Sequence, residues 1–122
     1  MDLFKFIDAD FNISDNRGEL YQLVHDGYKQ VNVLYSLKGV TRGGHFHKES
    51  SELFFVVSGS VQVHLKKGNE EGYRVFYKGD FFKIFPEVVH SMTFLEDCIL
   101  VALYDVPVEK MDGTMDIISW EI

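Results

Sequence analysis

The stretch GGHFHKESSELFFVVSG, residues 43–59, contains two histidines one residue apart and a glutamate five positions after the second. Side chains alternate along a strand, so His45 and His47 are expected on one side and Phe46 on the other. Glu52 heads an apolar run, where a buried carboxylate is costly unless a positive charge compensates it. The stretch therefore predicts a metal site or a pair of catalytic bases, the alternative being a strand that is rich in histidine by chance.

A second stretch, GDFFKIFPEVVHSM at residues 79–92, places His90 four residues after Pro86, at the start of another apolar segment. Two imidazoles and one carboxylate inside a barrel would form a three-ligand face with positions left open for water or substrate, and His90 would add a fourth ligand. The predicted ligands of a divalent Zn, Mn, Ni or Fe ion are His45, His47, Glu52 and His90. Of the remaining histidines, His25 is expected at the surface, whereas His64 shares a strand face with Gln62 that points either to a cavity or to solvent.

Most of the chain has the alternating or continuously apolar pattern of short strands, separated by turn-forming pairs such as Asp26-Gly27 and Asp112-Gly113. No stretch of a dozen residues has a helical period. SVQVHLKK (60–67) alternates strictly, whereas ELFFVVS (52–58) is typical of a strand buried on both faces. Strands are expected at 20–25, 29–37, 52–58, 60–67, 73–77, 81–85, 91–95, 99–104 and 115–120. The 122 residues are predicted to form one all-β domain over 1–122, a sandwich or barrel of about ten strands.

Composition excludes several classes of protein. The formal net charge of −7 argues against a general nucleic-acid binder, because neutralising phosphates requires a basic surface. The chain has no basic start followed by a long apolar stretch and no segment long enough to span a membrane, so neither a signal peptide nor a membrane partner is expected. Cys98 is the only cysteine, which excludes an intramolecular disulfide and fits a reducing compartment. A cytoplasmic location is therefore predicted.

The spacing of these residues resembles the cupin superfamily. Five residues reproduce the first cupin motif without a gap: Gly39, His45, His47, Glu52 and Gly59. The second motif is matched by Gly79, Pro86 and His90, but its spacers differ by a residue, the glycine after the proline is missing, and Phe94 stands where asparagine is common. The resemblance covers roughly residues 28–105. It implies a jelly-roll barrel (a double-stranded β-helix) with flanking strands at both ends, the four ligand-type residues converging inside, and commonly a dimer.

Three short segments of the sequence resemble a narrower group of cupins. VTRGGHFHK (40–48) looks like the signature of sugar-nucleotide 3,4-ketoisomerases, with Phe46 in place of the usual alanine. KQVNVLYSLKGVTRG (29–43) is similar to deoxysugar 3,5-epimerases and to the cupin domain fused to some capsular-polysaccharide reductases. LEDCILVALYDVPV (95–108) again resembles the ketoisomerases. The resemblance implies a protein of polysaccharide or deoxysugar biosynthesis that acts on a nucleotide-linked 4-keto-6-deoxysugar by shifting a proton next to the ketone.

Such chemistry requires a base near neutral pH and a positive partner for the enediolate oxygen. The unperturbed pKa of histidine, about 6.5, suits the base, so His45 and His47 are the candidate proton-transfer residues. They are alternatively metal ligands, since a ligated nitrogen cannot also take the proton. Arg42 could hold the ketone oxygen or a diphosphate by paired hydrogen bonds, and Lys48 is a further candidate for phosphate. Tyr35 is a candidate acid, although a buried tyrosine with an ordinary hydrogen bond would look the same.

The sequence departs from the ketoisomerases in Gln30–Val33, where those relatives carry an arginine followed by tyrosines. Those relatives also do not generally depend on metal, whereas Glu52 and His90 are retained here. The predicted function is an isomerase or epimerase without a cofactor. The alternatives are a metal-dependent cupin of another class (a dioxygenase or small-molecule lyase) and a non-catalytic sugar- or metal-binding cupin. A nucleotide-diphosphate sugar and a second copy of the chain are the expected partners. Aromatic residues expected either near the base or in the core and dimer interface are Tyr73, Phe76 and Tyr77.

Overall fold

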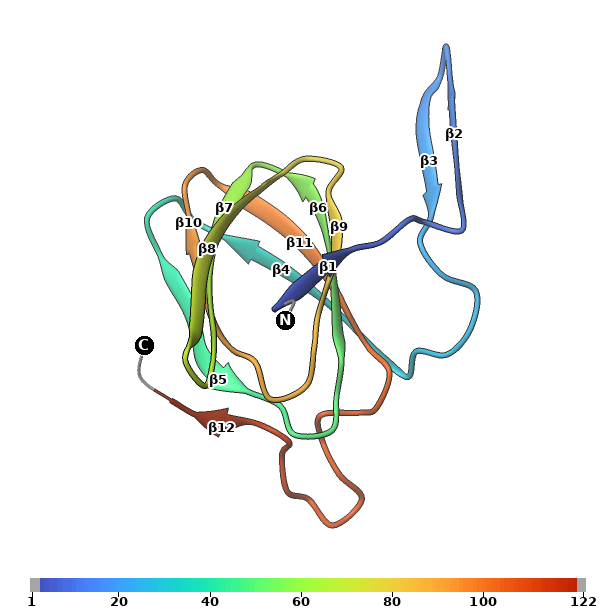
Figure 1. The fold of residues 1–122 in the computed structure, drawn as a ribbon. Coiled ribbons are helices and arrows are strands. Elements are labelled where there is room, and N and C mark those ends of the chain that lie inside the picture. Colours follow the sequence, from blue (N-terminus) through green and yellow to red (C-terminus); the bar gives the residue numbers. More distant parts are fainter. Residues whose placement is uncertain (1–2, 121–122) are drawn as a thin grey trace.

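The computed structural model describes residues 3–120 and is built from strands (Figure 1). The strands are β1 (Phe4–Phe6), β2 (Phe11–Asp15), β3 (Gly18–Gln22), β4 (Gln30–Ser36), β5 (Thr41–Phe46), β6 (Glu52–Ser58), β7 (Ser60–Lys67), β8 (Glu70–Tyr77), β9 (Phe81–Ile84), β10 (Val89–Phe94), β11 (Cys98–Tyr104) and β12 (Ile118–Ser119). No helix occurs within this range, so none is long and apolar enough to cross a membrane. The all-β prediction is confirmed.

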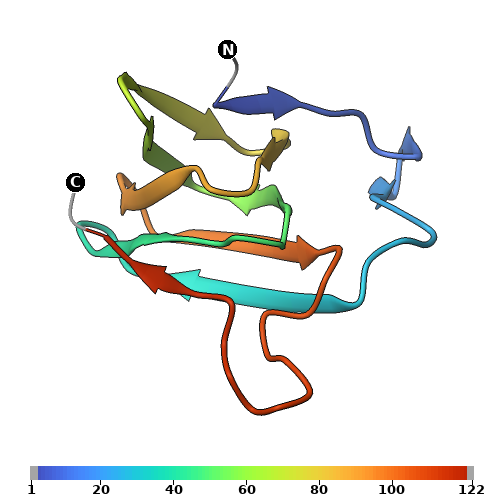
Figure 2. The same cartoon turned by 60° about the horizontal axis from the view of Figure 1, so that its bottom comes forward.

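Ten of the strands form two five-stranded antiparallel sheets that close into a jelly-roll barrel (Figures 1 and 2). The first sheet has the order β1-β9-β6-β11-β4 and the second has the order β12-β5-β10-β7-β8. Most neighbours within a sheet are far apart in the chain. Strands from both ends of the sequence join the sheets, because β1 pairs with β9 and β12 pairs with β5.

The main core lies between the two sheets. Along β7, Val61, Val63 and Leu65 point into it, as their alternation predicts. The run Leu53–Val56 of β6 is buried on both faces: Phe54 and Val56 belong to the main core. Leu53 and Phe55 belong to a second cluster on the outer side of the first sheet, where they pack against the N-terminal segment. The layers therefore hold β6, and with it Glu52, in place from both sides.

The hairpin of β2 and β3 projects away from the barrel (Figure 1, blue). Its side chains are largely exposed, including Phe11 at 45% and Leu20 at 54%. The expected strand over 20–25 begins earlier than predicted and ends at Gln22. Neither β1 nor β2 was expected. β2 is exposed along its whole length, whereas β1 has only three residues, of which Phe4 packs against the main core.

Candidate active site

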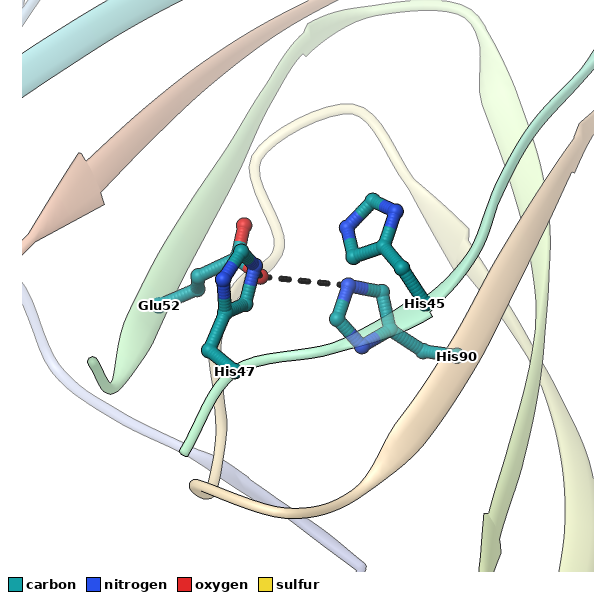
Figure 3. Close-up of side chains that lie close together, drawn as sticks. All are labelled: His45, His47, Glu52 and His90. Atoms are coloured by element: carbon teal, nitrogen blue, oxygen red, sulfur yellow. Dashed lines mark ion pairs between the residues drawn. The ribbon is translucent and has the colours of Figure 1, made fainter. Parts of the chain in front are cut away.

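Four side chains from three strand regions converge inside the barrel (Figure 3). His45 lies near the end of β5, His47 directly follows that strand, Glu52 begins β6, and His90 lies in β10. One nitrogen or oxygen atom from each of them lies within 4.8 Å of the others. His47, Glu52 and His90 are almost completely buried, at 4%, 2% and 3% exposed, and His45 is half-buried.

The pairing of β5 with β10 brings two of the histidines together. His45 lies opposite His90 in the register, and the register shifts between His90 and Ser91. Gly43 makes this approach possible: its φ is +104°, and a Cβ there would lie 2.8 Å from the carbonyl oxygen of His90. A residue with a side chain would push the two strands apart, so Gly43 is needed for the close approach of β5 to β10.

Backbone carbonyls fix which ring nitrogens face the carboxylate. His47 Nδ1 donates to the carbonyl oxygen of Asp116, and His90 Nδ1 lies 3.1 Å from that of Val88. Because a carbonyl only accepts, each Nδ1 carries the hydrogen and each Nε2 of a neutral ring presents a lone pair. These Nε2 atoms lie 2.6 Å (His47) and 3.1 Å (His90) from the same oxygen, Glu52 Oε1.

Lone pairs that face a carboxylate repel it unless a proton on a ring or a bound cation lies between them. With His47 neutral, His47 Nε2 and Glu52 Oε1 are the described buried side-chain atoms left without a hydrogen-bond partner, whereas a proton on His47 Nε2 would be donated to Glu52 Oε1. Three imidazoles and one carboxylate are the donor types that Zn, Mn, Ni and Fe accept, so the residues present fit a divalent metal. They equally fit a protonated His47 paired with an ionised Glu52.

The pKa values separate His45 from the buried pair. Burial lowers the pKa of His45 to about 4, and the charge of His90 acts in the same direction. Burial would also lower the pKa of His47, but the hydrogen bond and charge of Glu52 outweigh it, so this pKa is raised. Burial would raise the pKa of Glu52, yet the hydrogen bonds of His47 and His90 hold it far below its ordinary value. At neutral pH, therefore, His45 is a neutral base beside the His47–Glu52 pair.

A cavity of about 60 Å³ lies against this cluster. Its volume corresponds to about two water molecules, enough for the reacting edge of a ligand only. It is lined by Leu34, Arg42, Gly43, His45, Glu52, Phe54, His90, Met92 and Tyr104. An open hollow of about 760 Å³ also contacts Arg42 and Gly43, but its lining residue Ser91 lies opposite His64 in the register, so the hollow opens on the outward side of the sheet that contains β5 and β10. That volume is typical of a pocket for a whole small molecule.

Tyr104 is a site residue that the sequence did not single out. It ends β11 with its side chain inside the barrel, its ring 5.8 Å from that of His47. Burial, with the charge of Glu52, raises the pKa of its hydroxyl far above the ordinary range. The alternation of β11 signals its place, since Ala102 and Leu100 on the same face are fully buried.

Arg42 and Tyr35 occupy different places relative to the cluster. Arg42 lines the cavity, and its Nε donates to Ser36 Oγ at 2.8 Å. Tyr35 lies in β4 on the outer surface of the first sheet, is 72% exposed and does not line the cavity. The structure thus brings together His45, His47, Glu52, His90 and Arg42, and it does not place the Tyr35 side chain with them.

The remaining candidates lie outside the cluster. His64 points away from the barrel interior, where its ring stacks on Tyr73 at 4.1 Å and its Nε2 lies 2.6 Å from Glu71. His25 is exposed and bound to Asp10, as expected for a surface histidine. Of the three candidate aromatics, Phe76 is fully buried in the core, which rules out contact with a nucleotide base, whereas Tyr73 and Tyr77 are exposed. The backbone N–H of Lys48 donates to Asp116, and its side chain is exposed.

A known protein-family model matches most of the barrel. Residues 13–104 match the model of the polysaccharide biosynthesis C-terminal domain. The chain belongs to this family. No curated protein sequence matches it. The polysaccharide biosynthesis C-terminal domain accounts for three quarters of the chain, and residues 105–122 lie beyond the match.

Solved structures extend the assignment of this family member. A double mutant of the 3,4-ketoisomerase QdtA from Thermoanaerobacterium thermosaccharolyticum, in complex with TDP, is 28% identical, with a TM-score of 0.75 over 87% of this chain and 82% of that one. Another QdtA mutant, in complex with TDP-4-keto-6-deoxyglucose, is 25% identical, with a TM-score of 0.80 over 97% and 88%. The dTDP-4-dehydrorhamnose 3,5-epimerase of Sulfolobus tokodaii shares the fold at 20% identity, with a TM-score of 0.66 over 84% and 75%. The predicted cupin barrel and its resemblance to this group are confirmed.

Proposed function

We propose that the chain is an isomerase or epimerase of a TDP-linked 4-keto-6-deoxysugar in polysaccharide biosynthesis. The observation that carries the proposal is a neutral His45 at the cavity, between Arg42 and the buried His47–Glu52 pair. The similarity to QdtA, whose mutant binds TDP-4-keto-6-deoxyglucose, supplies the substrate class. The inner cavity would take the keto edge of the sugar.

In this reaction His45 removes the proton from the carbon next to the ketone. The electron pair of the broken C–H bond forms the C=C bond of an enediolate, and the carbonyl oxygen takes the negative charge. The Arg42 guanidinium is the nearby positive group that would stabilise it, together with the His47 ring when that ring is protonated. A proton added to the former ketone carbon, with loss of the neighbouring hydroxyl proton, gives the isomeric ketone. Return of a proton to the original carbon from the other face inverts that centre. The substrate is neither oxidised nor reduced overall.

The test is incubation with TDP-4-keto-6-deoxyglucose in D₂O, followed by NMR of the sugar. Deuterium is expected at a carbon next to the ketone, together with a 3-keto or epimerised product. His45→Asn should slow exchange by about 10²–10⁴-fold, the usual contribution of a positioned base. His64→Ala is the matched control and should retain the rate, because His64 faces away from the cavity. Tight TDP-sugar binding without exchange in the wild type would instead support a non-catalytic binding module.

A metal-dependent cupin is the second candidate, and the two Nε2 lone pairs facing Glu52 Oε1 favour it. His45, His47, Glu52 and His90 would hold the ion, which would supply Lewis-acid or redox chemistry. His45 would then not serve as a free base. Elemental analysis of wild type and His47→Ala, purified without added metal, distinguishes the two candidates. Near-stoichiometric metal that is lost in the variant supports the metal site, and oxygen consumption would identify a dioxygenase.

We also propose that the chain forms a homodimer through the outer surface of the first sheet, at β4. β4 is the edge strand of that sheet, and its outward side chains Val31, Val33 and Tyr35 are 59%, 53% and 72% exposed. An exposed apolar edge normally pairs with another chain or is protected by charge, and this one carries no outward charge. Light scattering should give a dimer for the wild type and a monomer for Val33→Glu; a monomeric wild type contradicts the proposal. We propose in addition that the protein is cytoplasmic, because its single cysteine, Cys98, is free and buried.

A further inference from the structure

The segment between β11 and β12 passes beside the loop that joins His47 to Glu52 (Figures 1 and 2, orange to red). This segment lies beyond residue 104, where the family match ends. It nevertheless supplies the acceptors for that loop. The four residues between His47 and Glu52 are Lys48–Ser51, and each of their backbone N–H groups donates to a carboxylate of the segment.

Asp116 makes most of these contacts. Its Oδ1 accepts the N–H of Lys48 at 2.9 Å, and its Oδ2 accepts those of Glu49 and Ser50, both at 3.0 Å. The side chain is only 4% exposed, so these are charge-assisted bonds shielded from water. Its own carbonyl oxygen accepts the hydrogen of His47 Nδ1. One residue therefore binds both the loop and the ring.

Two neighbouring contacts reinforce the attachment. Asp105 Oδ1 accepts the N–H of Ser51 at 2.8 Å, and Ser50 Oγ donates to the carbonyl of Val106 at 2.6 Å. The N–H of Asp116 donates to the carbonyl of Val108 at 2.7 Å, which fixes its backbone from the other side. The carbonyl that faces His47 is thus held by both its own side chain and its own chain segment.

We propose that Asp116 is a positioning residue that sets the tautomer and orientation of His47. By holding the acceptor on Nδ1, it keeps Nε2 directed at Glu52, which both the proton-transfer site and a metal site require. The inference builds on the proposed function, since it concerns the same histidine, but it is independent of which reaction occurs. It also means that the functional unit extends past the matched domain to at least residue 116.

NMR of ¹⁵N-labelled protein tests this directly. The wild type should show a slowly exchanging His47 Nδ1–H resonance, assigned by its absence in His47→Gln. In Asp116→Ala the resonance should disappear or exchange measurably faster, because the carbonyl that accepts this hydrogen is no longer held in place by the side chain. Asp112→Ala is the matched control: this aspartate of the same segment accepts hydrogen bonds from Thr114 and should leave the resonance unchanged. Asp116→Asn keeps one carbonyl oxygen and should give an intermediate rate.

The amide spectrum of each variant reports whether it folds. If Asp116→Ala does not fold, the comparison rests on Asp116→Asn, and wild-type exchange there overturns the inference. Wild-type exchange in a folded Asp116→Ala overturns it as well. If the wild type turns over the TDP-sugar, Asp116→Ala should lower kcat about tenfold or more with little change in KM. If the wild type shows no turnover but the resonance behaves as expected, the proposed function fails and the positioning role stands.

Discussion

Replacing Gly43 by alanine should destabilise the barrel more than the same change at Gly39. Both glycines have positive φ, +104° and +89°, so an alanine at either position costs about 1–2 kcal/mol of backbone strain. Of these two positions, Gly43 is the one at which the new Cβ would meet backbone atoms, 2.8 Å from the carbonyl oxygen of His90 and 2.9 Å from the Cα of Ser91. Relieving that overlap by moving β5 away from β10 should add about 1–3 kcal/mol. Gly39 has open space around it.

Equilibrium unfolding in urea measures both changes, because a domain of this size is expected to unfold in one cooperative step. Gly39→Ala should lower the free energy of unfolding by about 1–2 kcal/mol and Gly43→Ala by about 2–5 kcal/mol. Since His45 and His90 face each other across the displaced strands, Gly43→Ala should also slow the proposed reaction by up to about a hundredfold. Equal losses of stability in the two variants would refute the argument that close packing at Gly43 builds the site.

The further predictions concern four single side chains. Tyr104→Phe should slow the proposed reaction on the order of a hundredfold, because it removes the buried hydroxyl beside Glu52. Tyr35→Phe should change the rate by no more than about twofold, since that hydroxyl is outside the barrel; similar effects in the two variants would contradict this placement. With the pKa of His45 lowered to about 4, kcat/KM should show no loss from protonation of this base until pH approaches 4; an inflection near 6.5 assigned to His45 would contradict the lowered pKa. The same shift should reduce stability as pH falls from about 6.5 to about 4, because the unfolded chain binds the proton first. Burial raises the pKa of Cys98 from 9.0 to about 11, so at pH 8 its thiolate fraction is about a hundredfold lower than that of a free thiol, and its labelling by a disulfide reagent should be at least that much slower before unfolding than after.

Strands with a strong hydrophobic period could be predicted from the sequence, and β6 and β7 have the expected bounds. β4 shows where the pattern misleads. Its apolar residues Val31 and Val33 suggest an inward face, but the structure turns Leu34 and Ser36 inward and leaves the valines exposed. The inner face of this strand borders the site, where Leu34 lines the cavity and Ser36 accepts a hydrogen bond from Arg42, so apolarity alone does not decide which side chains point inward.

The motif spacing identified the residues that converge, but not what holds them. His45, His47, Glu52 and His90 share a recognisable pattern, whereas Asp116 lies 64 residues after Glu52 in a segment without any strong local signal. Its role depends on a chain crossing that only the folded barrel defines. Tyr104 is similar: alternation places it on one face of β11, but which face is internal depends on the sheet packing.

The pairing order of the strands has a consequence for synthesis of the chain on the ribosome. β5 finds one partner in β10 and the other in β12, and β1 pairs with β9, so both sheets remain incomplete until late segments emerge. Pairings between such distant segments make folding slow and leave edges unpaired meanwhile. The acceptor for His47 comes from residue 116, so the site itself should be among the last features to form. A nascent chain halted at residue 104 would contain the whole family match and still lack an ordered His47.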